Sequence, residues 1–266
     1  MNKFNNLQKK LELNFSIDNS SSKGVLLKVS RDGYLYKTGE FKKPVFSNLA
    51  SVTECICSEI LDLMNIPHAS YDLIPVVVKE SSNWRRQEVL CCRSKLFTDS
   101  NTSIIHACKL DNGKKDYETI VNSLGCQFQM DINNMILFDY LVNNTDRHHR
   151  NFGLLLNITN GDLLFAPLYD HGFSLCSDFD EEYILNEDLD DILMDCDYSK
   201  LCCGCNREQL QYVKSYSCNL NFEYEDLLNI VNKYKKYFSD KRFLVITKLL
   251  KVRLENLRRL FTDGEI

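Results

Sequence analysis

The chain of 266 residues lacks any run of about 18 apolar residues, the length that a membrane-spanning helix needs. Its first residues, Met1 to Asn6, lack the apolar core of a secretory signal peptide. Internal repeats and low-complexity blocks are also absent. We therefore expect a globular cytoplasmic protein that does not bind membranes, with secretion into a host cell left open.

Two common phosphate-binding signatures are missing. The sequence contains neither G-x-x-x-x-G-K-[ST] nor G-x-G-x-x-G, so it is not a Walker-type protein and departs from ordinary protein kinases. Ser20 to Gly24 is a short segment of small residues before a predicted hairpin. It is interpreted either as a flexible exposed loop or as a loop close to bound phosphates.

Basic residues are missing from 151–199, where Asp and Glu occur 12 times. A protein that binds nucleic acid needs a basic face, and the net charge here is −5, so no direct nucleic-acid partner is expected. The acidic block is interpreted first as a solvated surface. The alternative is a local field that favours magnesium or a basic partner segment.

The twelve cysteines lack the paired spacing of a zinc site. The densest cluster runs from Cys196 to Cys218, and Cys203-Gly204-Cys205 within it is only C-x-C. In an unsecreted chain, reduced thiols that act as small buried hydrophobes are the better expectation. The role of the cluster stays open.

The apolar patterns that are present predict a β-rich first part and a helical second part. Strands are expected at 25–29, 34–37, 74–78 and 88–92, with Arg31-Asp32-Gly33 as a hairpin turn. A helix is expected over Thr53–Asn65, capped by Ser51 or Thr53 and ended before Pro67. The fold class is α+β, with a first lobe at 1–97 and a second lobe at 98–266.

The second part begins with a polar segment, 98–103, that we expect to link the lobes. A helix over 130–142 and a hairpin, 152–156 with 163–166 around Asn160-Gly161, are expected to follow. The chain then ends in two helical patterns, 224–237 and 243–261.

The stretch from Asn143 to Asn151 joins that helix to that hairpin. Asp146 and Asn151 are five positions apart, and Asp170 follows the hairpin. This is the spacing of a phosphoryl-transfer centre. Asp146 is expected to accept the proton of the substrate hydroxyl or to orient it. Asn151 and Asp170 are expected to coordinate Mg²⁺ that bridges the phosphates of ATP.

Lys37 ends a strand of the first lobe. Alone it would be an exposed lysine, but beside the three residues above it is expected to contact the phosphates. Glu54, on the following helix, is the expected ion-pair partner. Glu59 is the competitor on another face of that helix.

Three histidines, His148, His149 and His171, suggest metal binding or acid–base chemistry. Because Mg²⁺ prefers oxygen ligands, His148 is expected instead to donate hydrogen bonds that hold the loop beside the cofactor. Arg147 and Arg150 either contact phosphate or brace the loop, and both interpretations stay open.

These residues resemble the motifs of one family, the HipA-like serine/threonine kinases, in its compact stand-alone form. The segments that carry the resemblance, from about residue 15 to 180, are Asn144-Thr145-Asp146-Arg147-His148, Asn151-Phe152-Gly153, Ala166 to Leu175, Thr53 to Ile56, Asn65-Ile66-Pro67 and Tyr34 to Lys37. The two motifs of the second lobe, the loop from Asn144 to Gly153 and the segment from Ala166 to Leu175, are the more specific, and the glycine-poor Ser20–Gly24 departs from the family's pattern.

The resemblance implies a bilobal protein-kinase-like fold, ATP and Mg²⁺, and transfer to Ser or Thr hydroxyls of a protein substrate. It implies that the cofactor is bound by Lys37, Glu54, Ser21, Ser22, Lys23, Gly24, His148 and Asp170. Several family members are toxins of toxin–antitoxin pairs that phosphorylate aminoacyl-tRNA synthetases and sometimes a serine of their own phosphate loop. Ser20, Ser21 and Ser22 are candidates for such self-modification, and an antitoxin or regulatory protein is a candidate partner.

Two alternatives remain beside this hypothesis. One is a nucleotide-binding pseudokinase or partner-binding module, and the other is a kinase that acts on a lipid or a small-molecule alcohol. Residues 1 to about 15 leave no room for the extra N-terminal subdomain of long family members. We therefore do not expect an antitoxin to bind in the manner of those proteins.

Overall fold

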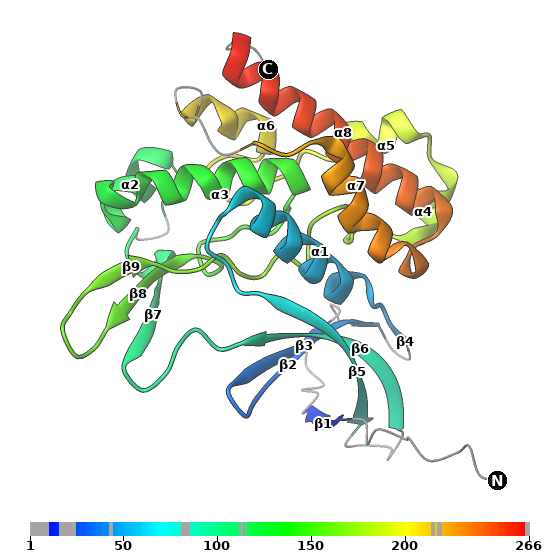
Figure 1. Ribbon diagram of the computed structural model, residues 1–266, viewed down its shortest axis with the longest axis horizontal. Coiled ribbons are helices and arrows are strands. Elements are labelled where there is room, and N and C mark those ends of the chain that lie inside the picture. The colour runs from blue at the N-terminus through cyan, green and yellow to red at the C-terminus, as the bar shows by residue number, and fades with distance from the viewer. Residues whose placement is uncertain are drawn as a thin grey trace.

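A computed structural model describes residues 11–15, 25–42, 45–80, 86–111, 114, 116–213, 216 and 220–263. The fold is α+β and two-lobed, with a β-rich first lobe and a helical second lobe, as predicted (Figure 1). We propose 97/98 as the boundary between the lobes. Within the described ranges, no helix combines the length and the apolar character that crossing a membrane requires.

The first lobe is built on one six-stranded sheet. Its strands are β1 (Leu11–Phe15), β2 (Val25–Arg31), β3 (Tyr34–Lys42), β4 (Val45–Phe46), β5 (Tyr71–Glu80) and β6 (Arg86–Lys95). The order is β1-β5-β6-β3-β2, with β4 paired to β3. Only the β1–β5 pair is parallel among these described strands. All four predicted strands therefore exist, each longer than predicted.

The β2–β3 hairpin turns at Asp32 and Gly33, which have φ angles of 51° and 77°. Two successive residues with positive φ make the turn whose twist matches paired strands, and Asp-Gly suits it. The register places Lys28 opposite Lys37 across the two strands. This pairing brings two ammonium groups to the same part of the sheet.

Helix α1 (Leu49–Met64) packs between the sheet and the second lobe (Figure 1). The predicted caps are wrong, because Ser51 and Thr53 are buried inside the helix and Asn48 occupies the N-cap position. Burial of this first turn against the sheet extends the helix beyond its apolar pattern. The predicted end is confirmed: Asn65 has a φ of 54° and ends the helix two residues before Pro67.

The second lobe holds the remaining elements. Its α-helices are α2 (Tyr117–Leu124), α3 (Gln129–Val142), α4 (Glu181–Asn186), α5 (Leu189–Asp195), α6 (Asn206–Gln209), α7 (Tyr224–Lys233) and α8 (Asp240–Asp263). Its 3₁₀ turns are η1 (Ala107–Lys109), η2 (Cys126–Phe128), η3 (Leu210–Tyr212) and η4 (Lys235–Tyr237). A three-stranded sheet consists of β7 (Thr102–His106), β8 (Gly153–Asn157) and β9 (Leu163–Phe165), in that order.

Strand β7 corrects the predicted linker. Thr102 and Ser103, expected in a polar connection, pair with Asn157 and Leu156 of β8. Their polar side chains concealed a strand whose partner comes some fifty residues later in the chain. The predicted β8–β9 hairpin is confirmed, with Gly161 at a φ of 78°.

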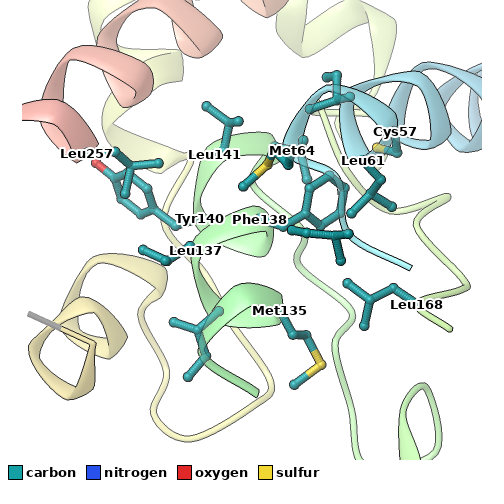
Figure 2. Close-up of a cluster of buried hydrophobic side chains, with 14 of the residues drawn as sticks. Cys57, Leu61, Met64, Met135, Leu137, Phe138, Tyr140, Leu141, Leu168 and Leu257 are labelled. Carbon is teal, nitrogen blue, oxygen red and sulfur yellow. The ribbon is translucent and has the colours of Figure 1, made fainter. Parts of the chain in front are cut away.

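One core joins the two lobes. Figure 2 shows Leu61 and Met64 of α1 beside Phe138 and Leu141 of α3, and all four are buried in the same cluster. Helix α3 is apolar and buried around most of its circumference, and Leu257 of α8 belongs to the same cluster. Because α3 is held on several sides, the loop that follows it starts from a rigid base.

The acidic block at 151–199 and several cysteines agree with the simpler interpretations, a solvated surface and buried reduced thiols. In the acidic block, the carboxylate residues of α4 and α5 are exposed, as expected of a solvated surface. Cys55, Cys57, Cys91 and Cys92 are buried as free thiols. Cys218 lies outside the described residues.

Candidate functional site

Lys37 is the centre of a buried charge cluster. Its Nζ lies 2.6 Å from Oε1 of Glu54, 2.9 Å from Oδ1 of Asp170 and 3.2 Å from the hydroxyl of Tyr71. The predicted Lys37–Glu54 ion pair is therefore confirmed. Glu59 instead contacts Lys233 and Tyr234 at the other side of α1.

The charges of this cluster reinforce one another. Burial disfavours the ammonium of Lys37, but the carboxylates of Glu54 and Asp170, with Tyr71, hold its pKa well above the ordinary value. Burial likewise disfavours the carboxylate of Asp170, yet Lys37 and Lys28 lower its pKa. Both groups are therefore charged at neutral pH.

Lys28 is a member of the site that sequence reasoning missed. Its Nζ lies 3.4 Å from Oδ2 of Asp170, while Lys37 contacts the other carboxylate oxygen. The available signal was the hairpin register, which sets Lys28 opposite Lys37. A fixed Asp-Gly turn would have predicted that pairing.

The segment around Asp170 is tied to α1. Asp170 has a φ of 64°, and the backbone N–H of His171 donates to Oε2 of Glu54 at 2.9 Å. Glu54 thus holds Lys37 with one oxygen and the Asp170 segment with the other. Burial, with the nearby Arg147 and Lys37 cations, puts the pKa of His171 well below its usual value. Its imidazole is neutral, and Nδ1 lies 2.9 Å from the Arg147 guanidinium.

The loop after α3 begins at Asn143, whose φ of 51° ends the helix. The Asn144 side chain accepts from the backbone N–H of Asp146 at 3.1 Å. The Asn151 amide then donates to the backbone oxygen of Asp146 at 3.0 Å. The structure therefore brings Asp146 and Asn151 together, as their spacing predicts.

Arg147 is the brace of this loop. Its guanidinium is fully buried and donates to both carboxylate oxygens of Asp139 in α3, at 2.8 and 3.0 Å. The same group donates to the backbone oxygens of Asn151 and Tyr169, at 2.8 and 2.9 Å. One side chain therefore links the helix, the end of the loop and the segment that carries Asp170. Of the two open interpretations, bracing is the one that the structure supports for Arg147.

The neighbouring histidines differ in their surroundings. His148 is partly exposed, its Nδ1 accepts from the backbone N–H of Arg150 at 3.3 Å, and its Nε2 is 3.8 Å from Oδ2 of Asp146. His149 is buried and contacts the carboxylate of Asp111 and, at 3.3 Å, the backbone oxygen of Leu201. Contrary to expectation, the histidine that holds distant segments to the loop is His149, while His148 accepts a hydrogen bond within it.

A second missed residue is Lys200, whose ammonium contacts Oδ1 of Asp146. It lies 54 positions further along the chain, beyond α5. No spacing rule connects the two residues, since the intervening helices decide where the lysine returns.

A pocket lies beside the charge cluster. Its walls come from Lys28, Leu35, Lys37, Tyr71, residues 94–98, Ile104, His106, Tyr169 and Asp170. Apolar side chains come from Leu35, Leu96, Phe97 and Ile104, and charged ones include Lys28, Lys37 and Asp170. Such a pocket suits a ligand with one flat apolar part and one anionic part.

The oxygen donors expected to hold magnesium fit that task. Asp170 is ionised, and Asn151 donates through its amide nitrogen, which leaves the amide oxygen free of any donor among the described side chains. Hard cations such as Mg²⁺ take carboxylate and amide oxygens together with phosphates. Within the described part of the chain, no group of three or more His, Cys, Asp or Glu is arranged to hold a metal by itself.

Ser20, Ser21, Ser22, Lys23 and Gly24 lie outside the described residues, so their expected role stays a prediction. The remaining predicted residues fall into two groups. Lys37, Glu54 and Asp170 meet in one cluster, and Asp146, His148 and Asn151 form the loop.

The fold has clear counterparts among solved structures. The crystal structure of the Helicobacter pylori proinflammatory kinase CtkA matches with a TM-score of 0.68 and 14% identity, over 95% of this chain and 97% of that one. At this identity the likeness shows the fold alone. No curated protein sequence matches the chain.

Two further structures match less well. The complex of HipA, HipB and operator DNA from Shewanella oneidensis MR-1 has a TM-score of 0.49 and 13% identity, over 86% of this chain and 60% of that one. The golgi casein kinase has a TM-score of 0.45 and 13% identity, over 94% and 71%. Because both TM-scores are below 0.5, neither match is used to assign the fold or function of this chain.

A family model supplies the assignment. The model described as HipA-like C-terminal domain matches residues 7–191, which include the charge cluster and the loop. With the fold shared by CtkA, this match confirms the resemblance seen in the motifs. The chain belongs to the family of HipA-like C-terminal domains and has a protein-kinase-like fold.

Proposed function

We propose that the chain is an ATP- and Mg²⁺-dependent serine/threonine protein kinase of the HipA-like type. The observation that carries the proposal is the Arg147 brace, which ties the Asp146–Asn151 loop to the segment of Asp170, whose carboxylate meets Lys37 beside a pocket. Phosphoryl transfer depends on positioning and charge neutralisation, and this arrangement supplies both. CtkA, which shares the fold, is described as a kinase.

In this proposal the nucleotide base packs against the apolar side chains of the pocket, and the phosphates lie at Lys37 and Lys28. Lys37 neutralises phosphate charge and is held in place by Glu54, which pairs with it at 2.6 Å. Asp146 accepts the hydrogen bond of the acceptor hydroxyl and takes up its proton.

Asp170 and the amide oxygen of Asn151 would hold magnesium. When bound, the metal supplies charge neutralisation between the phosphates. Lys28 and Lys37 pair with the carboxylate of Asp170, at 3.4 and 2.9 Å. The chain thus keeps the carboxylate ionised and ready to act as a ligand.

The acceptor is a Ser or Thr hydroxyl of a protein, and Ser20, Ser21 and Ser22 are candidate sites of self-modification. The proposal also includes a toxin-like role in the cytoplasm, with an antitoxin or regulatory protein as partner. Ser21, Ser22, Lys23, Gly24 and His148 would complete the cofactor site.

The test is transfer from labelled ATP with Mg²⁺ to a casein-type substrate or to the chain itself, compared with Asp146→Asn. Wild-type labelling that the variant loses, with phosphosites mapped by mass spectrometry, supports the proposal. Nucleotide binding is measured in parallel, because a ligand of the native state raises its thermal midpoint. If folded wild-type protein binds ATP but transfers nothing to any acceptor, the pseudokinase alternative replaces this function. Labelling confined to lipids or small alcohols would change the acceptor class.

A further inference from the structure

Asp146, the proposed proton acceptor, has a cationic partner for which the proposed function has no role. The ammonium of Lys200 contacts Oδ1 of Asp146, and the two side chains are 41% and 21% exposed. An exposed ion pair of this kind contributes little to stability, because both charges remain hydrated. Stability alone therefore does not account for a lysine at this position.

Lys200 is carried by a short closed segment. Tyr198 and Cys205 form an antiparallel bridge, and the backbone N–H of Ser199 donates to the oxygen of Gly204 at 3.2 Å. Leu201, the next residue, is buried. The backbone on both sides of Lys200 is therefore held by contacts within the segment, while the Lys200 side chain is partly exposed.

That segment is fastened to the Asp146 loop on each side of the lysine. On the N-terminal side of Lys200, the backbone oxygen of Tyr198 accepts from the side-chain amide of Asn206 at 3.0 Å. The same amide donates to the backbone oxygen of Asn144 at 3.3 Å. On the C-terminal side, His149 lies 3.3 Å from the oxygen of Leu201. Asn144 and His149 both belong to the loop, so the loop and the lysine segment form one unit that aims the ammonium at Asp146.

The positions of the other cations around the proposed site indicate a role for the Lys200 ammonium. In phosphoryl transfer, negative charge spreads over the oxygens of the transferred group, between the acceptor and the departing diphosphate. Lys28 and Lys37 contact Asp170, on the diphosphate side of the proposed site. The Arg147 guanidinium is buried against structural acceptors. Residues 151–199 contain no Lys or Arg, and Lys200 is the first Lys or Arg after Arg150.

We propose that Lys200 is a catalytic residue of the phosphoryl transfer, an inference that rests on the proposed function. Its ammonium pairs with Asp146 in the nucleotide-free chain and contacts the terminal phosphoryl oxygens when nucleotide and acceptor are bound. The acceptor oxygen bonds to the terminal phosphorus as the bond from that phosphorus to the bridging oxygen breaks. The electron pair leaves with the nucleoside diphosphate, the hydroxyl proton passes to Asp146, and Lys200 neutralises the transferred group throughout.

The experiment compares steady-state transfer by wild type, Lys200→Met, Lys200→Gln and Lys200→Arg. Loss of a preorganised charge partner that acts in the transition state lowers kcat by about 100- to 1000-fold. Because the contact is stronger in the transition state than in the bound ground state, kcat falls far more than the KM for ATP changes. Lys200→Arg, which retains the cation, recovers part of kcat. Lys248→Met, at an exposed position of α8, is the matched control and leaves both constants unchanged.

The outcomes separate the two proposals. Full activity in both neutral variants overturns the role of Lys200 and leaves the proposed function standing. A rate above wild type also overturns it, since Lys200 would then be a clamp that inhibits Asp146. A rise in KM with constant kcat assigns Lys200 to nucleotide binding and overturns the transition-state role. If the wild type itself transfers nothing, the proposed function fails and this inference with it. The ATP-induced shift in thermal midpoint shows for each variant that the nucleotide site is intact, and two neutral variants guard against misfolding of one.

Discussion

The ammonium of Lys37 and the carboxylate of Glu54 form a 2.6 Å ion pair in which the two side chains are only 4% and 3% exposed. Glu54 also accepts from the backbone N–H of His171, so α1, β3 and the segment after β9 meet at one carboxylate. In a buried ion pair, each charge compensates the cost of removing the other from water, so loss of either partner destabilises the fold. The pair therefore couples the fold of the first lobe to the position of Asp170.

Replacement of Lys37 by Met should lower the free energy of unfolding by about 3–5 kcal/mol, because Glu54 and Asp170 would be left as buried charges without their shared cation. Lys28→Met is the control, since Lys28 also contacts Asp170 but its side chain is 43% exposed. It should cost about 0–1 kcal/mol. Urea denaturation measures both, and equal losses would contradict the special status of the buried pair.

Arg147→Lys should destabilise the chain by about 2–4 kcal/mol, although the charge is retained. A lysine cannot pair with both oxygens of Asp139 and also reach the carbonyl oxygens of Asn151 and Tyr169. Arg150→Lys, in the same loop but exposed, should leave stability unchanged. The transfer rate should fall only for Arg147→Lys, and a normal rate in that variant would argue against the brace.

His171 should make the wild type less stable in mild acid. Its folded-state pKa lies well below the ordinary value near 6.5, so below that pH the unfolded chain binds a proton that the folded chain does not. Stability is then lost as pH falls from about 6.5, by at most about 1.4 kcal/mol per pH unit. His171→Asn should reduce this slope between pH 6.5 and 5, whereas His148→Asn, at a partly exposed site, should keep it. Denaturation midpoints at several pH values test this. Burial also lowers the pKa of His106, so some slope remains, and a slope in His171→Asn equal to that of the wild type would refute the assignment.

Gly153→Ala should cost about 1–3 kcal/mol, because a methyl group there would lie only 2.1 Å from the backbone oxygen of Ile105 in β7. Opening of the β7–β8 pair would also displace Asn151, two residues earlier, so transfer should fall as well. Gly204→Ala, where no atom lies within 4 Å of the added carbon, is the control. Thermal unfolding of both variants checks the comparison, and equal midpoints would show that the strands can separate freely.

Much of the fold was readable from local signals. The Asp32-Gly33 turn, the αL residue before Pro67 and the apolar pattern of α3 all act within a few residues, so the elements they define were predictable. The start of α1 and the strand β7 were not. Burial against the sheet extends α1, and β7 depends on a partner, β8, that is distant in the chain.

By itself the sequence determined the family and the expected chemistry. Asp146, Asn151 and Asp170 lie in two short motifs that are close to each other in the chain, so the motifs can be recognised without the fold. It also identified Lys37 and Glu54 as partners, through strand and helix patterns close to one another. Only the tertiary structure decided which residues complete the site. The contact of Lys200 with Asp146 and the use of Arg147 as a brace depend on how helices between distant segments pack. That packing depends on the whole core, and no short window of sequence contains it.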